Sequence, residues 1–271
     1  MSGQIKFYER NIIDLTNTNV TISVTDSVAT NTGSTFADYM RNRKNTSAWI
    51  TTGSSDAGTT TLIVDMTESR SLEKIIIIGH NFKAYTVKYW NGAAYVDFST
   101  AIAETAYADT DSFHDFTAIS TIKIQIIITE TQVADEDKYI KQLILTEEIG
   151  QFDAYPEIKN PTHDNGKRVT KMLSGKKNIV SAVGAFNCEL AVSTLSNAAD
   201  LALIEQLFER KVGFLVLLSG ELESQFKNVL AGYRNEDIYL MKCSNNYEPE
   251  FYKYCYQLGT KVKMKLTEVI A

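Results

Sequence analysis

The chain has 271 residues, of which 44% are hydrophobic and 22% are charged, and its formal net charge is −6. At roughly 150 residues per domain, this length predicts two domains, each able to bury a core without disulfides. The acidic balance argues against DNA binding as the main purpose, and no apolar run is long enough to be a membrane span. The first residues lack the apolar core of a secretory signal, so we expect synthesis and folding in the cytosol.

The first part of the chain, residues 1–150, has the pattern of packed antiparallel strands. Short β-branched and aromatic runs alternate there with Gly, Asn, Asp and Ser turns. The run Ile75–Ile78 predicts a strand buried on both faces, and Asn91-Gly92 predicts a hairpin, because both positions of a type I′ turn need positive φ. We expect a loop over residues 99–117 and a strand over residues 121–129. Without an amphipathic helix among these strands, the pattern predicts a β-sandwich.

The composition changes after residue 150, and two of the three prolines follow within residues 151–177. We therefore place a domain boundary at residues 150–165 and expect both halves to fold independently. In residues 151–271 the pattern predicts a hairpin from residue 167 and one helix over residues 198–210, whose apolar positions share one face. The strands expected after it include residues 227–233. These elements predict an α+β domain dominated by a sheet, either a barrel or a sandwich.

Residues from about 20 to 148 resemble the discoidin, or galactose-binding-like, sandwich. The matching segments are Asn45–Trp49, Thr61–Asp65, Leu72–Ile78, Tyr85–Gly92, Ile122–Ile126 and Ile140–Leu145. The resemblance implies a mainly β fold with two packed layers of antiparallel strands. That fold hosts sugar binders, lipid binders and purely structural modules, so it does not decide the function.

Residues from about 165 to 270 are similar to the tail-tube-like fold of long-tailed bacteriophages and contractile injection systems. The matching segments are Lys167–Lys177, Phe186–Val192, the helix after Ser196, and Gly213–Leu218. That family includes tube, hub and distal tail proteins, so the resemblance implies a C-terminal barrel with one helix that assembles into rings. In typical distal tail proteins the barrel precedes the sandwich, whereas here the sandwich comes first.

The residues that could carry metal or catalytic chemistry do not form motifs. The cysteines are Cys188, Cys243 and Cys255, and the histidines are His80, His114 and His163. Their spacing matches no zinc site, and we expect free thiols. The segment Asp109–Asp115 has acids at alternate positions but lacks the glycine and bidentate Glu of a calcium loop, so a solvated loop is expected, with calcium as the open alternative. Nucleotide-binding and nucleophile motifs are absent from the sequence. We expect no enzyme and no cofactor.

Two groups of residues are candidates for binding. One is the only basic cluster, which is a solvated hairpin surface or an arm that docks on an acidic neighbouring subunit. Its members are Lys167, Arg168, Lys171, Lys176 and Lys177.

The second group, Arg41, Arg43 and Trp90, could line a sugar-stacking site with nearby aromatic residues. Aromatic residues on strands more often belong to the core. Because no cluster of aromatic residues falls on predicted loops, we expect no tight, specific sugar binding.

The sequence thus predicts a non-enzymatic structural protein of a phage or phage-like tail, located in the virion tail. It would form a ring, a hexamer or trimer, at the tail tip, hub, distal tail or tube end, by heterologous contacts between barrels. Its partners would be copies of itself and other tail proteins, without sequence-specific nucleic acid binding or membrane insertion. The alternative is a carbohydrate- or surface-binding module that acts through the N-terminal sandwich.

Overall fold

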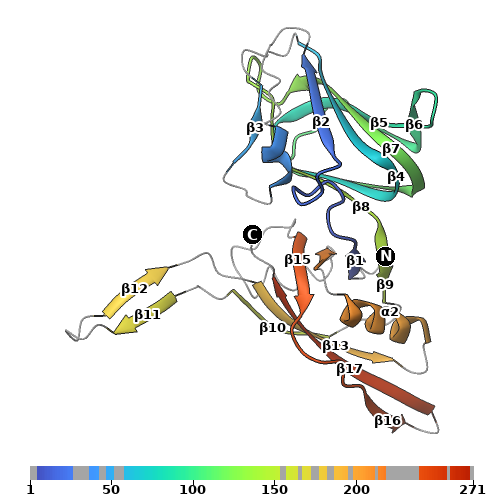
Figure 1. Ribbon diagram of the computed structural model, residues 1–271, viewed down its shortest axis with the longest axis vertical. Helices are drawn as coiled ribbons and strands as arrows, with labels where there is room; N and C mark the ends of the chain where they lie inside the picture. The colour runs from blue at the N-terminus through green and yellow to red at the C-terminus, as the bar shows by residue number, and fades with distance from the viewer. Residues whose placement is uncertain are drawn as a thin grey trace. The chain divides into compact units, whose positions relative to one another are not determined.

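The protein is described here by a computed structural model and is mainly β, as predicted. The chain divides into two compact units. One consists of Asn11–Glu148, and the other consists of Met1–Arg10 together with Ile149–Ile270. Figure 1 shows the strands of each unit. The structure describes residues 5–26, 37–42, 47–51, 58–152, 157–163, 167–171, 177–181, 186–194, 198–210, 213–217, 238–254 and 257–268.

The unit Asn11–Glu148 contains a seven-stranded antiparallel sheet in the order β3-β8-β4-β7-β5-β6, with β2 paired to β4. The strands are β2 (Thr21–Asp26), β3 (Trp49–Ile50), β4 (Thr60–His80), β5 (Phe82–Trp90), β6 (Tyr95–Glu104), β7 (Ser112–Thr131) and β8 (Tyr139–Thr146). A 3-10 turn, η1 (Asp38–Arg41), lies between β2 and β3.

Strands β4 and β7 are long enough to serve both layers of a sandwich. Residues 60–65 of β4 pair with β2 and with residues 123–128 of β7, whereas residues 74–80 pair with β8. Shifts in register between Asp65 and Arg70, and between Leu72 and Lys74, separate the two parts. Side chains from both parts, such as Leu62 and Ile75, are 0% exposed and share one core. This arrangement agrees with the two-layered β-sandwich that the sequence predicts.

Two local predictions for this unit are confirmed and one is wrong. Ile75, Ile76 and Ile77 are each 0% exposed, as expected for a strand buried on both faces, whereas Ile78 is half-buried. A hairpin joins β5 and β6 as predicted, but its turn is not type I′, because Gly92 has a φ of 100° while Asn91 does not have positive φ, and residues 91–94 separate the strands. The loop predicted over residues 99–117 is shorter, because β6 runs to Glu104 and β7 begins at Ser112. The apolar residues at the start of β7, Phe113, Phe116 and Ile119, are three positions apart, so this segment lacks the alternation of apolar residues that marks a strand.

The other unit is built on an eight-stranded antiparallel sheet in the order β10-β13-β17-β15-β14-β1-β9, with β16 paired to β17. Its strands are β1 (Lys6–Tyr8), β9 (Glu148–Gln151), β10 (Glu157–His163), β13 (Phe186–Thr194), β14 (Phe214–Leu217), β15 (Ile238–Cys243), β16 (Glu250–Tyr254) and β17 (Gln257–Glu268). Over the described ranges the sheet is open, with β10 and β9 at its ends, so no barrel is seen. The strand expected at residues 227–233 lies outside the described residues.

The predicted helix is confirmed as α2 (Ala198–Glu209), and its Ile204 and Leu207 are 0% exposed in the core of this unit. No helix in the described part of the chain is long and apolar enough to span a membrane. Cys188 and Cys243 are free thiols, as expected, whereas Cys255 lies outside the described residues. Cys188 on β13 and Cys243 on β15 each pair in register with Leu266 of β17, which lies between these strands. Their Cα atoms are therefore about 10 Å apart, too far for a disulfide.

The first residues of the chain belong to this second unit. Strand β1 lies between β14 and β9 in the sheet, so the sandwich is inserted in the connection from β1 to β9. Phe7 is 0% exposed and packs edge-on against Phe152 and Phe214, with ring centroids 5.1 and 5.8 Å away. Just after β1, Glu9 accepts two hydrogen bonds from the Arg210 guanidinium at the end of α2. The sequence pattern had grouped residues 1–150 together.

Candidate functional site

The basic cluster lies on a hairpin that forms a sheet of its own. Strands β11 (Lys167–Lys171) and β12 (Lys177–Ser181) pair only with each other within the described ranges. The hairpin is inserted between β10 and β13, which pair with one another in the large sheet. Figure 1 shows β11 and β12 as a separate two-stranded ribbon. A two-stranded hairpin alone is marginally stable in water, so this one depends on something outside itself to remain ordered.

The register of the hairpin sets two lysines directly opposite each other. Lys171 pairs with Lys177 at the end nearest the turn, and Lys167 pairs with Ser181 at the other end. Like charges at directly opposite positions destabilise a strand pair. An acidic partner would relieve this repulsion. Arg168 pairs with Val180, and Lys176 lies outside the described residues.

Arg41, a candidate ligand residue, holds two segments of the sandwich together. Its Nε donates to Asp38 Oδ1 at 2.9 Å within η1. Its Nη1 donates to the backbone oxygens of Val20 at 3.2 Å and Asn17 at 3.4 Å. The side chain is 11% exposed, so the guanidinium serves mainly the protein's own acceptors. Arg43 lies outside the described residues.

Trp90, the third candidate, lies in a row of side chains across four strands. It pairs in register with Tyr95, and the two rings meet at 67° with centroids 5.2 Å apart. Since Tyr89 pairs with Ile124, the next position places Trp90 beside Lys123. Lys123 pairs in turn with Asp65. We call Asp65, Lys123, Trp90 and Tyr95 the sheet-face row; all four side chains are partly exposed.

An ion pair fixes the charged end of the sheet-face row. Lys123 Nζ lies 2.7 Å from Asp65 Oδ2. The hydrogen bond between them lowers the pKa of Asp65 and raises the pKa of Lys123, so both remain charged at neutral pH. The row therefore presents a carboxylate, an ammonium group and two aromatic rings in line on one face of the sheet.

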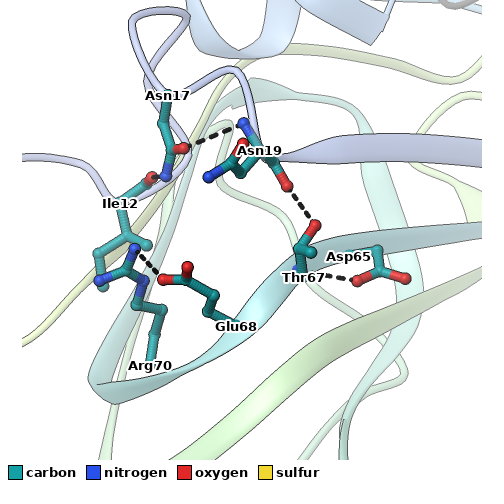
Figure 2. A network of polar contacts seen from close by, with 7 residues as sticks. All are labelled: Ile12, Asn17, Asn19, Asp65, Thr67, Glu68 and Arg70. Atoms are coloured by element: carbon teal, nitrogen blue, oxygen red, sulfur yellow. Dashed lines mark hydrogen bonds and ion pairs between the residues drawn. The ribbon is translucent and has the colours of Figure 1, made fainter.

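The turn after Asp65 holds its carboxylate in place (Figure 2). Its Oδ1 accepts a hydrogen bond from the Thr67 backbone N–H at 3.0 Å, and Thr67 has a φ of 64°. Thr67 Oγ1 donates to the Asn19 carbonyl at 2.5 Å. The Asn19 N–H donates to Asn17 Oδ1 at 3.2 Å. Through these contacts the segment before β2 fixes the orientation of Asp65.

A buried cluster of aromatic and histidine side chains lies inside the sandwich. His80 is 0% exposed, and its ring stacks on Tyr107 with centroids 5.5 Å apart. Tyr85 lies edge-on to His80 at 5.7 Å, and its hydroxyl is 2.9 Å from His114 Nε2. Burial lowers the pKa of both histidines and raises that of Tyr85, which keeps all three groups neutral near pH 7. No spacing or motif in the sequence predicts that these residues lie together.

His80 has one ring nitrogen that lacks a partner. Its Nδ1 accepts the Phe82 backbone N–H at 3.1 Å, so the neutral ring carries its proton on Nε2. Within the described part of the chain no acceptor reaches this buried Nε2. Burial lowers the pKa of His80 to about 4, although the nearby Asp111 opposes the shift. The ring is thus suited to the neutral state only.

The acids of the segment Asp109–Asp115 make contacts with the protein. Asp111 Oδ1 accepts the Gly79 backbone N–H at 2.5 Å, and Asp115 Oδ1 pairs with Lys74 Nζ at 2.5 Å. Lys74 is buried. In the ranges that the structure describes, no three His, Cys, Asp or Glu side chains gather in a way that could hold a metal ion.

No protein-family model and no curated protein sequence match the chain. Among solved structures, the sandwich is similar to chitosan-binding module 1 from a Paenibacillus sp. IK-5 chitosanase/glucanase, with 13% identity, 51% of this chain and 98% of that chain covered, and a TM-score of 0.39. It is also similar to the family 32 carbohydrate-binding module of C. perfringens NanJ, solved with galactose, at 18% identity, 53% and 99% coverage and a TM-score of 0.39. These likenesses concern the N-terminal half, which resembles the galactose-binding-like sandwich as the sequence predicts.

Proposed function

We propose that the protein is a non-enzymatic structural component of a phage or phage-like tail, where it assembles with copies of itself into a ring. The observation that carries this proposal is the hairpin of β11 and β12, which forms no sheet pairing with the rest of the described chain. With Lys171 opposite Lys177, the hairpin is poorly stabilised by itself and suited to an acidic neighbour. Ordering against that neighbour would couple assembly to folding of the arm.

The distribution of charge supports a neighbouring copy as that partner. Residues 11–148 contain 10 Lys and Arg and 18 Asp and Glu, which gives a net charge of −8. The rest of the chain contains 17 basic and 15 acidic residues, a net charge of +2. A basic arm that reaches the acidic sandwich of the next copy makes a head-to-tail contact. Repeated contacts of this kind close a ring when the rotation permits.

The inserted position of the sandwich is consistent with an assembly core that carries an added module. Both connections to the sandwich leave from neighbouring strands, β1 and β9. The unit that contains β1 and β9 can therefore keep one sheet and one core across the insertion. We assign the C-terminal unit to the tail-tube-like barrel class on the sequence resemblance, and place the ring at the tail tip, hub, distal tail or tube end.

Charge reversal in the hairpin tests the proposed arm. We expect the triple variant Lys171→Glu, Lys176→Glu and Lys177→Glu to stay folded, because β11 and β12 pair with no other strand of the described chain. It should fail to form rings, because like charges brought together at an interface are costly. Circular dichroism checks the fold, and sedimentation velocity checks the assembly.

A matched control keeps the charge at the same three positions with the substitutions Lys171→Arg, Lys176→Arg and Lys177→Arg. We expect this control to assemble normally. A hairpin variant that forms rings and enters particles at the wild-type level would show that the arm is not the assembly contact.

A second candidate function is carbohydrate or surface binding through the sandwich, and the sheet-face row is the observation that favours it. The partly exposed ring of Trp90 offers an apolar surface, while Asp65 and Lys123 offer charged hydrogen-bonding groups beside it. The row consists of side chains in register across one face of a sheet, whereas most small-ligand sites are clefts. The solved carbohydrate-binding modules of similar fold add a reason to test sugars on this chain.

A glycan array decides between weak and specific binding. We expect no tight, reproducible hit for the wild-type protein, because the row is built from side chains in register on one face of a sheet and most small-ligand sites are clefts. Any weak signal should fall in the variant Trp90→Ala but persist in Tyr39→Ala, which removes a ring that is 37% exposed elsewhere on the sandwich. A reproducible hit that Trp90→Ala abolishes would favour the carbohydrate-binding function over our main proposal.

A further inference from the structure

Strand β17 carries a line of lysines on the face of the large sheet that is turned away from the core. Val262, Met264 and Leu266 are at most 1% exposed and belong to the core. The residues that alternate with them are Lys261, Lys263 and Lys265, which we call the β17 lysine row. Side chains at alternate positions of a strand point to the same face and are about 6.7 Å apart. The row is thus a straight line of three cations.

Acidic residues near the β17 lysine row offset it only in part. Lys263 Nζ lies 3.9 Å from Glu250 Oε1, and the two side chains are 49% and 68% exposed. Glu189 pairs in register with Lys265 from β13. A further cation, the exposed Lys242, lies on the neighbouring strand β15. Glu250 also pairs in register with Lys261 from β16. The four lysines are thus accompanied by two glutamates, four positive charges minus two negative, which leaves a local charge of +2.

We propose that the β17 lysine row is a docking surface for the sandwich unit of a second copy of this chain. The argument is charge complementarity: the row belongs to the unit with a net charge of +2, and the sandwich carries −8. This inference rests on the proposed self-assembly and adds a second contact to the hairpin.

Strand β17 and the hairpin of β11 and β12 would contribute differently to such an interface. The hairpin loses conformational entropy when it docks, whereas β17 is held on both sides by β13 and β16 before any partner arrives. The row should therefore govern the rate of encounter and its salt dependence, as charged rims do. Its contribution should fall at high ionic strength, where the Debye length is about 3 Å at 1 M salt.

The test uses the full-length chain with Lys261→Glu, Lys263→Glu and Lys265→Glu, studied by sedimentation velocity at low and high salt. For the wild-type chain we expect self-association to weaken at least about tenfold as salt rises from about 50 to about 500 mM. The variant should associate at least about tenfold more weakly at low salt and lose the salt dependence. If the reversed charges impair folding, a variant with Gln at the same three positions replaces it. This neutral variant should also weaken self-association and its salt dependence, but by a smaller factor.

Charge rescue tests the identity of the partner. A second full-length variant carries Asp109→Lys, Asp135→Lys and Asp137→Lys at exposed positions of the sandwich loops. Each variant alone should associate weakly, and the mixture should regain association, because opposite charges then meet between copies. A mixture that stays as weak as its components would overturn the second copy as the partner.

Comparing the lysine-row variant with the hairpin variant tests this inference separately from the proposed function. If the lysine-row variant associates as the wild type does while the hairpin variant does not, the docking surface is wrong and the arm stands. If the row variant is impaired and the hairpin variant is not, the arm is wrong and the docking surface stands. A wild-type chain that is monomeric at every salt concentration would contradict both.

Discussion

A fragment that starts at residue 149 and lacks the first ten residues is expected to be insoluble or unfolded. Strand β1 occupies a position inside the large sheet, between β14 and β9. Its removal exposes the backbone edges of both neighbours and the core around Ile5 and Phe7, which are 0% exposed. By contrast, a chain in which a short linker replaces residues 11–148 should fold, because the two cut points lie on neighbouring strands. Expression yield, circular dichroism and thermal unfolding compare the two fragments.

A single substitution tests the same point in the intact chain. Phe7→Ala should lower the free energy of unfolding of this unit by about 3–5 kcal/mol, the usual cost of emptying a buried aromatic site. Domains are stable by only about 5–15 kcal/mol, so the loss is large. The matched control Lys6→Ala, on the same strand but half-buried, should cost much less. A soluble, cooperatively unfolding fragment 149–271 would show that β1 is dispensable.

The position of β1 explains why composition alone placed the domain boundary imperfectly. The strand has three residues, and its partner Phe214–Leu217 lies more than 200 residues away in sequence. A local pattern shows that a segment can form a strand, but the partner depends on packing across the whole unit. The long isoleucine run and α2 could be predicted, because each carries a local signal. The first is an unbroken apolar run, and the second has its apolar residues on one face.

The candidate sites likewise combine residues that the local sequence pattern singles out with residues that only contacts between distant segments bring close. Trp90 stands out in the sequence as an aromatic residue beside a turn, and its pairing with Tyr95 follows from the hairpin. Its neighbours Lys123 and Asp65 come from β7 and β4, and only the register of four strands brings them into line. The His80 cluster likewise depends on contacts between β4, β5 and β7 that no spacing rule contains.

The neutral state of His80 should make the stability of the sandwich fall in mild acid. Its pKa is about 4 in the folded protein, against 6.5 for the free side chain, because burial disfavours the charged ring. The unfolded chain therefore binds more protons between these two values. The resulting stability is fully present above about pH 6.5 and is lost as the pH falls toward about 4. Protonation would also remove the Nδ1 acceptor that Phe82 uses.

The expected loss from His80 is about 2 kcal/mol between pH 7.5 and pH 5, a window in which most carboxylates stay charged. Urea unfolding at a series of pH values measures it. The variant His80→Phe keeps an aromatic ring against Tyr107 but cannot titrate, so its stability should be lower overall and should change much less with pH. The control His114→Gln removes a histidine whose pKa is also lowered but which is only partly buried, and it should retain most of the pH dependence. If His80→Phe keeps the full wild-type slope, the buried His80 ring is not the group that titrates on unfolding.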